Sequence, residues 1–449
     1  MKIVVAGAGA GKTTSMAQQV LKRYTEVKDE KIIYVITYTN AARDKIREKI
    51  IELHGIIPKQ IKVETSHAFL LREIIFPFHH LLYGNQYILV SQMKLSDNHI
   101  FKARKIRELQ NNKIIHVEKV TETAKWIICG KARDLKSVKV KRKTLLAIIK
   151  RYMDSVFIDE AQDMDDKLAE IIRVFDNNEI NLYIVGDPKQ DLRGRNAFRR
   201  IIEEYNQKVE YKVENYRCPI SHVNFANNYI PLVERQIPQK LEQGKIEFIL
   251  ESKIKVNEFI QNSSWDYIFI INKTEKFITS SSRGIDAKHN LKYELRELIK
   301  KSNKYNEKEI EITLYKVFKD ILKIINTKEN IQILCTLEEI LSIKMSKQDR
   351  GKLSESLNYI RNVEEYQGII VNSIDNIKGL DGENCLFILT TSLAPYLFRE
   401  KVEQNKMLNY LYVALTRAKN KLVILITYEV EEQYGIEFIK NKFKEFLKI

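Results

Sequence analysis

The feature that most constrains this chain is a glycine-rich turn near its N-terminus. The apolar run Ile3–Val5 predicts a buried strand, and a helical pattern runs from Thr14 to about Tyr24. Between them lies the turn Ala6-Gly7-Ala8-Gly9-Ala10-Gly11-Lys12-Thr13. A strand, a glycine-rich turn and a helix start form a P-loop, in which backbone N–H groups and the helix N-terminus bind phosphate. The segment therefore predicts an α/β domain that binds a nucleotide.

The residues of this turn have separate expected roles. Lys12 is expected to reach the β- and γ-phosphates, and the hydroxyl of Thr13 to hold Mg²⁺. Ala6 stands where the general pattern has its first glycine, and a small residue fits that position. The ATP-binding residues predicted in this stretch are Ala6, Gly7, Ala8, Gly9, Ala10, Gly11, Lys12, Thr13 and Thr14. ATP and Mg²⁺ are thus the expected cofactors.

The charge balance indicates the class of partner. The 449 residues include 75 Lys and Arg against 59 Asp and Glu, a net charge of +16, which favours a polyanion such as DNA. The stretch from Lys94 to Arg151 holds 17 Lys and Arg against 5 Asp and Glu, so most of the excess lies there. A charge run is also typical of a merely solvated face. We expect Lys139, Lys141 and Arg142 in this stretch to contact DNA phosphates.

Membrane and disulfide-rich classes do not fit the sequence. The longest apolar runs have strand length, and the N-terminus enters a strand without room for a signal peptide, so we expect a cytoplasmic protein with no membrane partner. The four cysteines, Cys129, Cys218, Cys335 and Cys385, show no CxxC spacing. This spacing argues against a structural zinc site or a disulfide framework, and we assign the thiols no function.

Two further strand-like runs end in polar residues. They are Lys31–Thr37 and Ile61–Val63. The polar residues that follow them are Tyr38, Thr39, Asn40, Thr65 and His67. Because ligands gather at the carboxyl ends of parallel strands, we expect these side chains to lie on the same sheet edge as the P-loop. Helix capping explains the two threonines and the asparagine as well, and a structural role explains the histidine.

Paired carboxylates follow another apolar run, Tyr152–Ile158. They are Asp159 and Glu160, in the arrangement called Walker B, where Asp159 would hold Mg²⁺ and Glu160 would polarise the attacking water. A run of acids after a strand is also compatible with a solvated loop, but its distance downstream of a P-loop favours the nucleotide. The next strand-like run leads to Gln190, a residue type that orients the lytic water or senses the γ-phosphate.

Strand–helix alternation predicts two α/β lobes with parallel sheets. We place the first at residues 1–215, interrupted by a basic, mostly helical insertion at about 70–150. We place the second at residues 216–449, interrupted by a mostly helical insertion at about 281–364. Only the first lobe has a P-loop. This arrangement suggests one lobe that binds nucleotide and another that supplies residues across a cleft.

Seven segments carry a resemblance to a known family. They are the P-loop, Thr37–Ala42, Asp159–Asp163, Gly186–Gln190, Asn215–Arg217, Lys378–Leu380 and Tyr412–Lys419. In this order they resemble the motifs of the UvrD-like superfamily 1A helicases and cover most of both lobes. The resemblance implies two RecA-like domains, each with a helical insertion, that bind ATP between them and move 3′→5′ along single-stranded DNA. The second insertion looks reduced beside that of the family.

The resemblance also implies residue roles. Thr13 and Asp159 hold Mg²⁺. The implied catalytic residues are Glu160, Gln190, Arg217 and Arg417, the two arginines reaching the γ-phosphate. Tyr216 resembles the aromatic that stacks on adenine, and Asp381, where the family usually has Glu, is expected to contact the nucleotide. The implied DNA-binding residues are Tyr38, Thr39, Asn40, Thr65, His67, Arg193, Arg195 and Ser373.

Three departures from the family bear on mechanism. In the family a glutamine segment that reads adenine lies upstream of the P-loop, and because this sequence does not include it, we expect relaxed base selectivity. Arginines of the segment Asp191–Asn196 replace an aromatic base platform, and Asp375 replaces a histidine. These changes leave ATP hydrolysis intact and bring strand separation into question.

Two main functions follow. The leading hypothesis is a DNA-dependent ATPase of the UvrD-like class that translocates on DNA or unwinds it. The alternative is an ATP-hydrolysing, DNA-sensing subunit that regulates a partner nuclease with little unwinding of its own. Short chains of this build resemble the helicase-like subunit of the Gabija anti-phage system. An RNA-directed ATPase is a third, less favoured option.

Overall fold

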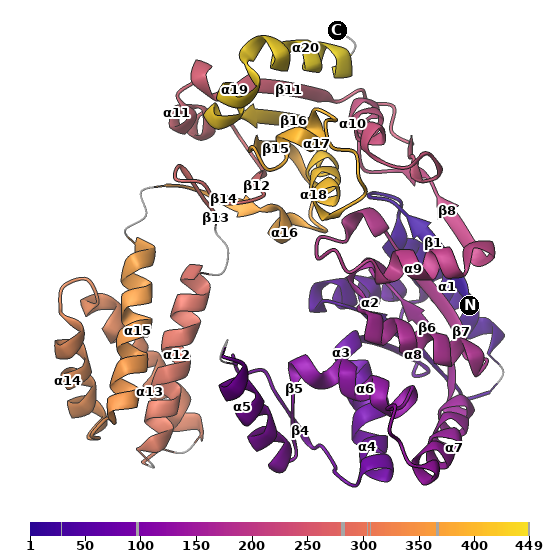
Figure 1. Ribbon diagram of the computed structural model, residues 1–449, viewed down its shortest axis with the longest axis vertical. Helices are drawn as coiled ribbons and strands as arrows, with labels where there is room; N and C mark the ends of the chain where they lie inside the picture. Colours follow the sequence, from indigo (N-terminus) through magenta and orange to yellow (C-terminus); the bar gives the residue numbers. More distant parts are fainter. Residues whose placement is uncertain are drawn as a thin grey trace. The chain divides into compact units, whose positions relative to one another are not determined.

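The computed structural model describes residues 1–27, 29–95, 98–279, 283–302, 304–305, 307–364 and 368–447. The chain forms two compact units (Figure 1). The P-loop unit contains residues 1–246, 395–421 and 442–449, and the second unit contains residues 247–394 and 422–441. The expected domain boundary between residues 215 and 216 stays a prediction.

The P-loop unit is built on a six-stranded sheet in the order β3-β2-β6-β7-β1-β8, and every neighbouring pair is parallel. Its strands are β1 (Lys2–Ala6), β2 (Ile32–Thr37), β3 (Ile61–Thr65), β6 (Met153–Ile158), β7 (Asn181–Gly186) and β8 (Val209–Lys212). Strand β7 separates β1, which precedes the P-loop, from β6, which precedes the paired carboxylates. All carboxyl ends of a parallel sheet share one edge, so the predicted site residues are gathered there.

Helices cover both faces of this sheet because successive strand side chains point to opposite faces. Val4 and Val35 pack with helices α1 (Lys12–Glu26) and α2 (Asn40–His54). Ile3 and Ile36 pack in a separate core on the other face. The helices that contribute to this second core include α6 (Val120–Ile128), α7 (Lys136–Tyr152), α8 (Asp166–Asn177) and α9 (Ala197–Glu204).

The basic stretch folds as an insertion between β3 and β6. Its helical elements are α3 (Ser66–Phe69), a π-helical turn at Leu70–Ile75, α4 (Phe76–Tyr83), α5 (His99–Asn111), α6 and α7. Two short parallel strands, β4 (Leu89–Ser91) and β5 (Ile114–His116), accompany them. Apolar residues such as Ile127 and Ile149 anchor α6 and α7 in the core of the P-loop unit.

The remaining elements of the P-loop unit follow β8 or return late in the chain. They include β9 (Glu214–Asn215), α10 (Ile220–Ala226), β10 (Ile237–Pro238) and α18 (Lys406–Leu415). Helix α17 (Ala394–Leu397) and helix α20 (Ile436–Leu447) include points where the chain passes between the units.

The second unit is built on another six-stranded sheet, in the order β11-β16-β15-β12-β14-β13. Its strands are β11 (Lys245–Leu250), β12 (Tyr267–Ile270), β13 (Phe277–Thr279), β14 (Ile369–Ser373), β15 (Gly382–Leu389) and β16 (Ala418–Ile426). Strand β12 pairs in parallel with β14 and β15, and β14 pairs in parallel with β13. The helices α11 (Val256–Gln261), α16 (Ile374–Ile377) and α19 (Tyr428–Tyr434) belong to the same unit.

Four helices are inserted between β13 and β14 and have an apolar core of their own (Figure 1). They are α12 (Arg283–Lys301), α13 (Glu307–Ile324), α14 (Asn330–Leu341) and α15 (Lys347–Glu364). Leu295, Phe318, Leu337 and Leu357 represent the four helices in this core. The predicted fold class, α/β with two parallel sheets and a mostly helical insertion in each, is confirmed.

Candidate nucleotide and nucleic-acid sites

The P-loop has the backbone that a phosphate cradle requires. Gly9 and Gly11 have φ angles of 72° and 68°, a region that glycine enters without steric cost. Lys12 begins α1 directly after the turn. Its Nζ donates to the backbone oxygens of Ala6 and Gly7 at 3.3 and 3.2 Å. The lysine thus lies over the turn, with carbonyl oxygens that a phosphate oxygen could replace as its acceptors.

The segment after β8 packs tightly against the P-loop. The backbone N–H of Tyr216 donates to the oxygen of Gly9 at 2.9 Å. A Cβ at position 9 would lie 2.6 Å from the Cβ of Arg217 and 2.7 Å from Oδ1 of Asn215. Gly9 is therefore required by two constraints, its positive φ and this close approach. The same packing brings Arg217 next to the P-loop and leaves the Tyr216 side chain 59% exposed.

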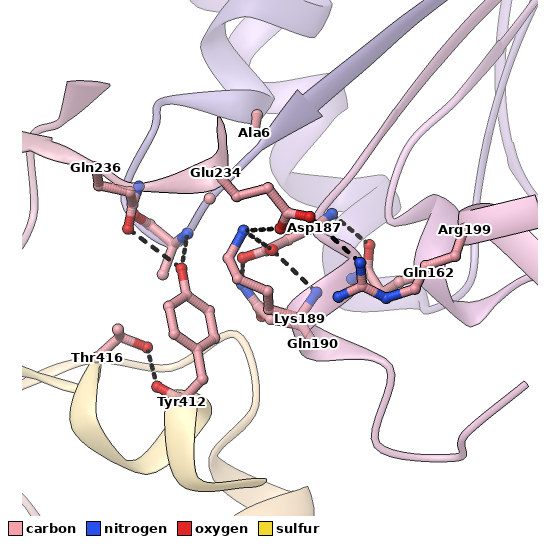
Figure 2. Close-up of polar contacts among 12 residues, drawn as sticks. Ala6, Gln162, Asp187, Lys189, Gln190, Arg199, Glu234, Gln236, Tyr412 and Thr416 are labelled. Carbon is pink, nitrogen blue, oxygen red and sulfur yellow. Dashed lines mark hydrogen bonds and ion pairs between the residues drawn. The ribbon is translucent and has the colours of Figure 1, made fainter. Parts of the chain in front are cut away.

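Two side chains hold the P-loop residue Ala8 through both of its backbone groups (Figure 2). The N–H of Ala8 donates to the hydroxyl of Tyr412 at 3.0 Å, and Nε2 of Gln236 donates to the Ala8 oxygen at 2.9 Å. The Tyr412 hydroxyl in turn donates to Oε1 of Gln236 at 3.2 Å. Because all three residues are buried, these contacts fix the P-loop backbone to α18 and to the segment before β10.

The paired carboxylates lie where β6 ends. Asp159 is 3% exposed, and its Oδ1 accepts the backbone N–H of Glu160 at 2.9 Å. Burial, with a further contribution from the charge of Glu160, raises the pKa of Asp159 to about 7, against an opposing effect of Lys12. Glu160 has a φ of 52°, a conformation that costs a non-glycine residue energy and clusters at functional sites.

Gln162 connects the carboxylates with the loop after β7. Its Nε2 donates to Oε2 of Glu160, and its Oε1 accepts the backbone N–H of Asp187 at 2.9 Å. Gln190, which follows β7, donates its Nε2 to Oδ2 of Asp187 at 2.9 Å (Figure 2). Two glutamines therefore reach the same aspartate, one through its backbone and one through its side chain.

A buried ion cluster surrounds Lys189 (Figure 2). Its Nζ lies 2.9 Å from Asp187 and 2.8 Å from Glu234, and Glu234 also pairs with Arg199 at 3.2 Å. The Nζ also lies 5.3 Å from the centre of the Tyr412 ring. Burial opposes charge on Lys189 and on Asp187, yet the partners hold the pKa of the lysine above and that of the aspartate below their ordinary values.

The two predicted arginines of the catalytic set lie in different surroundings. Arg217 is half-buried beside the P-loop. Arg417 follows α18 and is 1% exposed. Its Nε donates to the oxygen of Val413 at 2.9 Å and its Nη2 to the hydroxyl of Thr416 at 3.1 Å. These two partners lie at the C-terminal end of α18, and the expected contact of Arg417 with a γ-phosphate stays a prediction.

The residues at this edge fit a nucleotide with a divalent cation. The glycines leave room for phosphate oxygens, and Lys12 has a charge that its two carbonyl partners do not neutralise. Asp159 is a buried carboxylate next to the half-buried Glu160, and Mg²⁺ favours such oxygen ligands. A bound cation would offset the cost of burying two adjacent carboxylates. The raised pKa of Asp159 is the signature of that cost.

Three predicted DNA-binding residues lie at helix starts. The Oγ1 of Thr39 accepts the N–H of Ala42 at 3.1 Å and caps α2, in which Asn40 is the first residue. The Oγ1 of Thr65 accepts the N–H of Ala68 at 3.3 Å and caps α3. The capping alternative thus holds for both threonines. Thr39 and Asn40 are also exposed, so their contact with DNA stays a prediction.

Tyr38, His67 and Arg195 gather around Asp165. Burial lowers the pKa of His67, with Asp165 opposing the effect and Arg195 adding to it. Burial also raises the pKa of Tyr38, with contributions from Asp163 and Asp165. The Tyr38 hydroxyl is buried and has no hydrogen-bond partner among the described residues. The sheet edge therefore brings together three of the predicted DNA-binding residues, beside a carboxylate that sequence analysis did not assign to this site.

Arg193 and Arg195 differ in exposure. Arg193 is exposed. Arg195 is half-buried and donates to the backbone oxygen of Asp163 at 2.6 Å. Of the two, Arg193 has the more accessible guanidinium for a phosphate contact.

Ser373 and Asp381 belong to the second unit. The Ser373 hydroxyl accepts the N–H of Asn376 at 3.3 Å and caps α16, and its side chain is almost fully buried. Asp381 is half-buried just before β15. Their expected contacts with DNA and nucleotide stay predictions.

The expectation for the basic stretch is wrong at Arg142. This side chain is 8% exposed, pairs with Asp134 and donates from Nε to the oxygen of Ile127 at 2.9 Å. Arg142 lies three residues before Leu145 on the buried face of α7, so it fixes the helix rather than meeting phosphate. Lys139 and Lys141 are exposed, as expected.

Sequence reasoning missed the partners that hold the P-loop. Gln236 and Glu234 lie in a segment without a recognisable motif. Tyr412 and Lys189 lie in two of the seven family-like segments, but the residue types of those segments did not indicate the contacts of either side chain. Among the described residues, no group of three or more His, Cys, Asp or Glu side chains forms a metal site, and none of the described helices is long and apolar enough to cross a membrane.

Comparisons with known proteins agree with this geometry. Residues 1–194 match the model of a family described as an AAA domain. Over 99% of its length the chain is 25% identical to the Gabija protein GajB of Bacillus cereus (strain VD045), of which the match covers 97%.

Two further relatives are probable DNA helicase II homologues of Mycoplasma. The one from Mycoplasma capricolum is 21% identical over 51% of this chain, and the one from Mycoplasma pneumoniae is 23% identical over 61%. The matches span 38% and 46% of those two proteins, less than half of each. Residues 1–194 of the chain thus match the model of an AAA domain, and the chain is similar to the Gabija protein GajB and to two probable DNA helicase II homologues.

Proposed function

We propose that this protein is a DNA-dependent ATPase of the UvrD-like class that couples ATP hydrolysis to 3′→5′ translocation on single-stranded DNA or to duplex unwinding. The observation that supports it best is the buried Asp159 beside Glu160, with Lys12 close enough to lower the Asp159 pKa. This is the donor set that holds a nucleotide and its cation. We also propose the two domains expected from the sequence, at residues 1–215 and 216–449, as the functional lobes.

ATP is the proposed cofactor, with Mg²⁺. The P-loop backbone and Lys12 bind the phosphates, and Thr13 and Asp159 hold the cation, which would neutralise charge that develops on the phosphates. Tyr216 is exposed beside the P-loop, which suits stacking on a base. Glu160 accepts a proton from the attacking water at its carboxylate, and Gln162 orients that carboxylate through its Nε2 donor.

DNA is the proposed polymer partner. The exposed Thr39, Asn40 and Arg193 and the cluster of Tyr38, His67 and Arg195 lie on elements at the carboxyl edge of the P-loop sheet. Contacts at that edge would couple DNA binding to the nucleotide site, because neighbouring strands of one sheet end in the two sets of residues. Arg217, Arg417, Gln190 and Asp381 complete the proposed nucleotide contacts, and Thr65 and Ser373 complete the proposed DNA contacts.

Steady-state ATP hydrolysis with and without single-stranded DNA, together with unwinding of a 3′-tailed duplex, tests the proposal. We expect DNA to stimulate hydrolysis, and Glu160→Gln to abolish hydrolysis and strand separation while DNA binding persists. Wild-type protein that hydrolyses no ATP with any DNA or partner would contradict it. A double-stranded RNA or single-stranded RNA that stimulates more strongly than DNA would indicate an RNA-directed ATPase instead.

A second candidate function is an ATP-hydrolysing, DNA-sensing subunit that regulates a partner nuclease in anti-phage defence. It is favoured by the extent of the match: the chain aligns with 97% of the Gabija protein GajB but with less than half of each helicase II homologue. If this function holds, wild-type protein hydrolyses ATP yet separates no strands alone. Co-expression with a candidate nuclease should then give DNA cleavage that Glu160→Gln alters.

A further inference from the structure

The P-loop unit has a surface pocket where the segment after α10 meets the segment before α18. This pocket is separate from the P-loop. It encloses about 280 Å³. Its wall combines aliphatic side chains, among them Leu232, Val402 and Leu408, with the amides of Asn228 and Gln404. None of the motifs discussed above contributes a residue to this wall.

Three cations surround the pocket. They are Arg235, Arg399 and Lys401, and all three are exposed. Within the part of the chain that the structure describes, none of them forms an ion pair with a carboxylate, although other exposed cations such as Lys2, Lys150 and Arg200 do. Glu400 and Glu403 are close in sequence but do not line the pocket. The pocket therefore offers three positive charges without a carboxylate partner around an apolar wall.

Arg399 stands at a position that favours glycine. It follows α17 and has a φ of 62°, the left-handed conformation in which helices commonly end. Its N–H donates to the oxygen of Tyr396 at 3.1 Å, so the chain turns sharply here. A side chain in this conformation costs conformational energy that glycine does not. Holding a guanidinium at the pocket at that cost indicates a use for it beyond the turn itself.

The wall of the pocket favours a peptide over a nucleic acid. Leu232 and Val402 are 75% and 64% exposed, so they offer contact to an aliphatic side chain. The two tyrosines of the wall, Tyr229 and Tyr396, are buried. Their hydroxyls bond to the Leu397 oxygen and to Asn405. No described aromatic residue of the wall therefore presents a face on which a nucleobase could stack.

We propose that this pocket is a docking site for an acidic segment of a partner protein, in which carboxylates pair with Arg235, Arg399 and Lys401 and an aliphatic side chain packs on Leu232 and Val402. Charge complementarity identifies the occupant: guanidinium groups bind carboxylates in paired hydrogen bonds. The apolar wall adds contact area that inorganic phosphate would not use.

Helix α18 connects the pocket with the nucleotide site. Leu408 lies in the pocket wall, and Tyr412, one turn later, accepts the N–H of Ala8 in the P-loop (Figure 2). Asn409, between them, donates to the oxygen of Asp191 at 3.0 Å. A segment docked in the pocket that Leu408 helps to line is therefore expected to change the nucleotide affinity. This coupling rests on the proposed ATPase function, whereas docking itself does not.

Binding of fluorescein-labelled acidic peptides to the full chain, without nucleotide, tests the docking. The panel contains short peptides in which glutamates flank a central leucine or valine, and each has a matched peptide with glutamine in place of glutamate. We expect the acidic peptides to bind and the glutamine peptides to bind at least tenfold more weakly. The variant R235A/R399G/K401A should lose at least tenfold in affinity.

The matched control removes the same charge elsewhere. Arg47, Arg107 and Lys59 are exposed and lie outside the pocket. R47A/R107A/K59A should keep wild-type affinity for the peptides. Equal losses in both triple variants, or no binding by any peptide of the panel, would overturn the proposal. A single-stranded oligonucleotide that binds with an equal dependence on the pocket cations would assign the pocket to nucleic acid instead.

The single variant Arg399→Gly separates docking from folding. A residue that only stabilised the turn would lower the thermal midpoint when replaced. We expect the midpoint to stay the same or rise, because glycine relieves the left-handed backbone, while peptide affinity falls. A lower midpoint with unchanged affinity would contradict the role. In the same samples, acidic peptide should shift the KM for ATP, and an unchanged KM with intact docking would refute the coupling through α18 alone.

Discussion

The two six-stranded sheets have similar architecture but bury different side chains. In the P-loop unit, charged groups are buried at or after the carboxyl ends of the strands, among them Asp159, Asp187 and Lys189. In the second unit, Glu431 is the buried charged residue among those described, and it accepts the N–H of Ser252 at 3.0 Å. Ser373, the last residue of β14, caps α16.

The two sheets therefore differ in the free-energy cost of the charges that they bury. Buried charges destabilise a fold unless partners or ligands compensate them. The P-loop unit tolerates them with an ion cluster around Lys189 and with a carboxylate pair that a cation would complete. The second unit has a mainly apolar core, in which Phe269 stacks on Phe387. We therefore expect the rate of ATP hydrolysis to depend mainly on residues of the first sheet. A substitution in the second sheet should change that rate less.

The largest effect is expected at the carboxylate pair. Glu160→Gln removes the proton acceptor and should lower the rate of ATP hydrolysis by roughly 10²–10⁴-fold while nucleotide binding persists. The corresponding change in the second unit, Asp381→Asn, should cost less than about tenfold. Steady-state hydrolysis and fluorescent-nucleotide binding measure both. A larger loss of hydrolysis rate in Asp381→Asn than in Glu160→Gln would contradict the greater importance assigned to the first sheet.

The ion cluster should give the largest effect on stability. Lys189→Met leaves Asp187 and Glu234 buried without their shared cation, although Arg199 still reaches Glu234. We expect a loss of about 3–5 kcal/mol in the free energy of unfolding of the P-loop unit. In the second unit, Glu431→Gln should cost only about 1 kcal/mol, because one hydrogen bond is weakened. Urea denaturation compares the two, and equal losses would contradict the comparison.

The P-loop unit should also respond to acid through a buried histidine. Burial lowers the pKa of His222 in α10 to about 4, and its side chain is 1% exposed. Between this pKa and that of an unfolded histidine, near 6.5, the unfolded chain binds more protons. The contribution of the neutral His222 to stability is therefore full above the unfolded pKa and is lost as pH falls toward 4, by about 3 kcal/mol.

His222→Asn should remove most of this loss, and His54→Asn, at an exposed site, should not. Denaturation of each variant at several pH values between 4 and 7 measures the effect. If the same pH dependence persists in the His222→Asn variant, it belongs to another group, such as the buried His79, whose pKa burial also lowers.

The smallest effect concerns the P-loop backbone. Tyr412→Phe removes the acceptor of the Ala8 N–H and leaves that group buried without its partner. We expect a cost of about 1–2 kcal/mol, seen as a KM for ATP raised about tenfold with a smaller change in kcat. Tyr428→Phe, at an exposed position of the second unit, is the matched control. Equal KM values for both variants would show that the hydroxyl does not position the P-loop.

Sequence patterns were sufficient to predict the fold class and to locate the proposed nucleotide site. Glycines between a strand and a helix favour a P-loop at Ala6–Thr13 over other turns. An apolar strand that ends in two acidic residues likewise favours a cation ligand at Asp159. Such patterns are local, so periodicity and residue type suffice to find them. The burial of Arg142 could also have been predicted, because it shares a helix face with Leu145 and Ile149.

The side chains that hold these motifs in place became apparent from the three-dimensional contacts alone. Ala8 and Tyr412 are 404 residues apart, and Lys189 and Glu234 are 45 apart. The letters of the sequence indicate that such groups are polar, but not which of many polar partners each one meets. That choice depends on packing, because a buried polar group must find a partner among the residues that the fold places next to it.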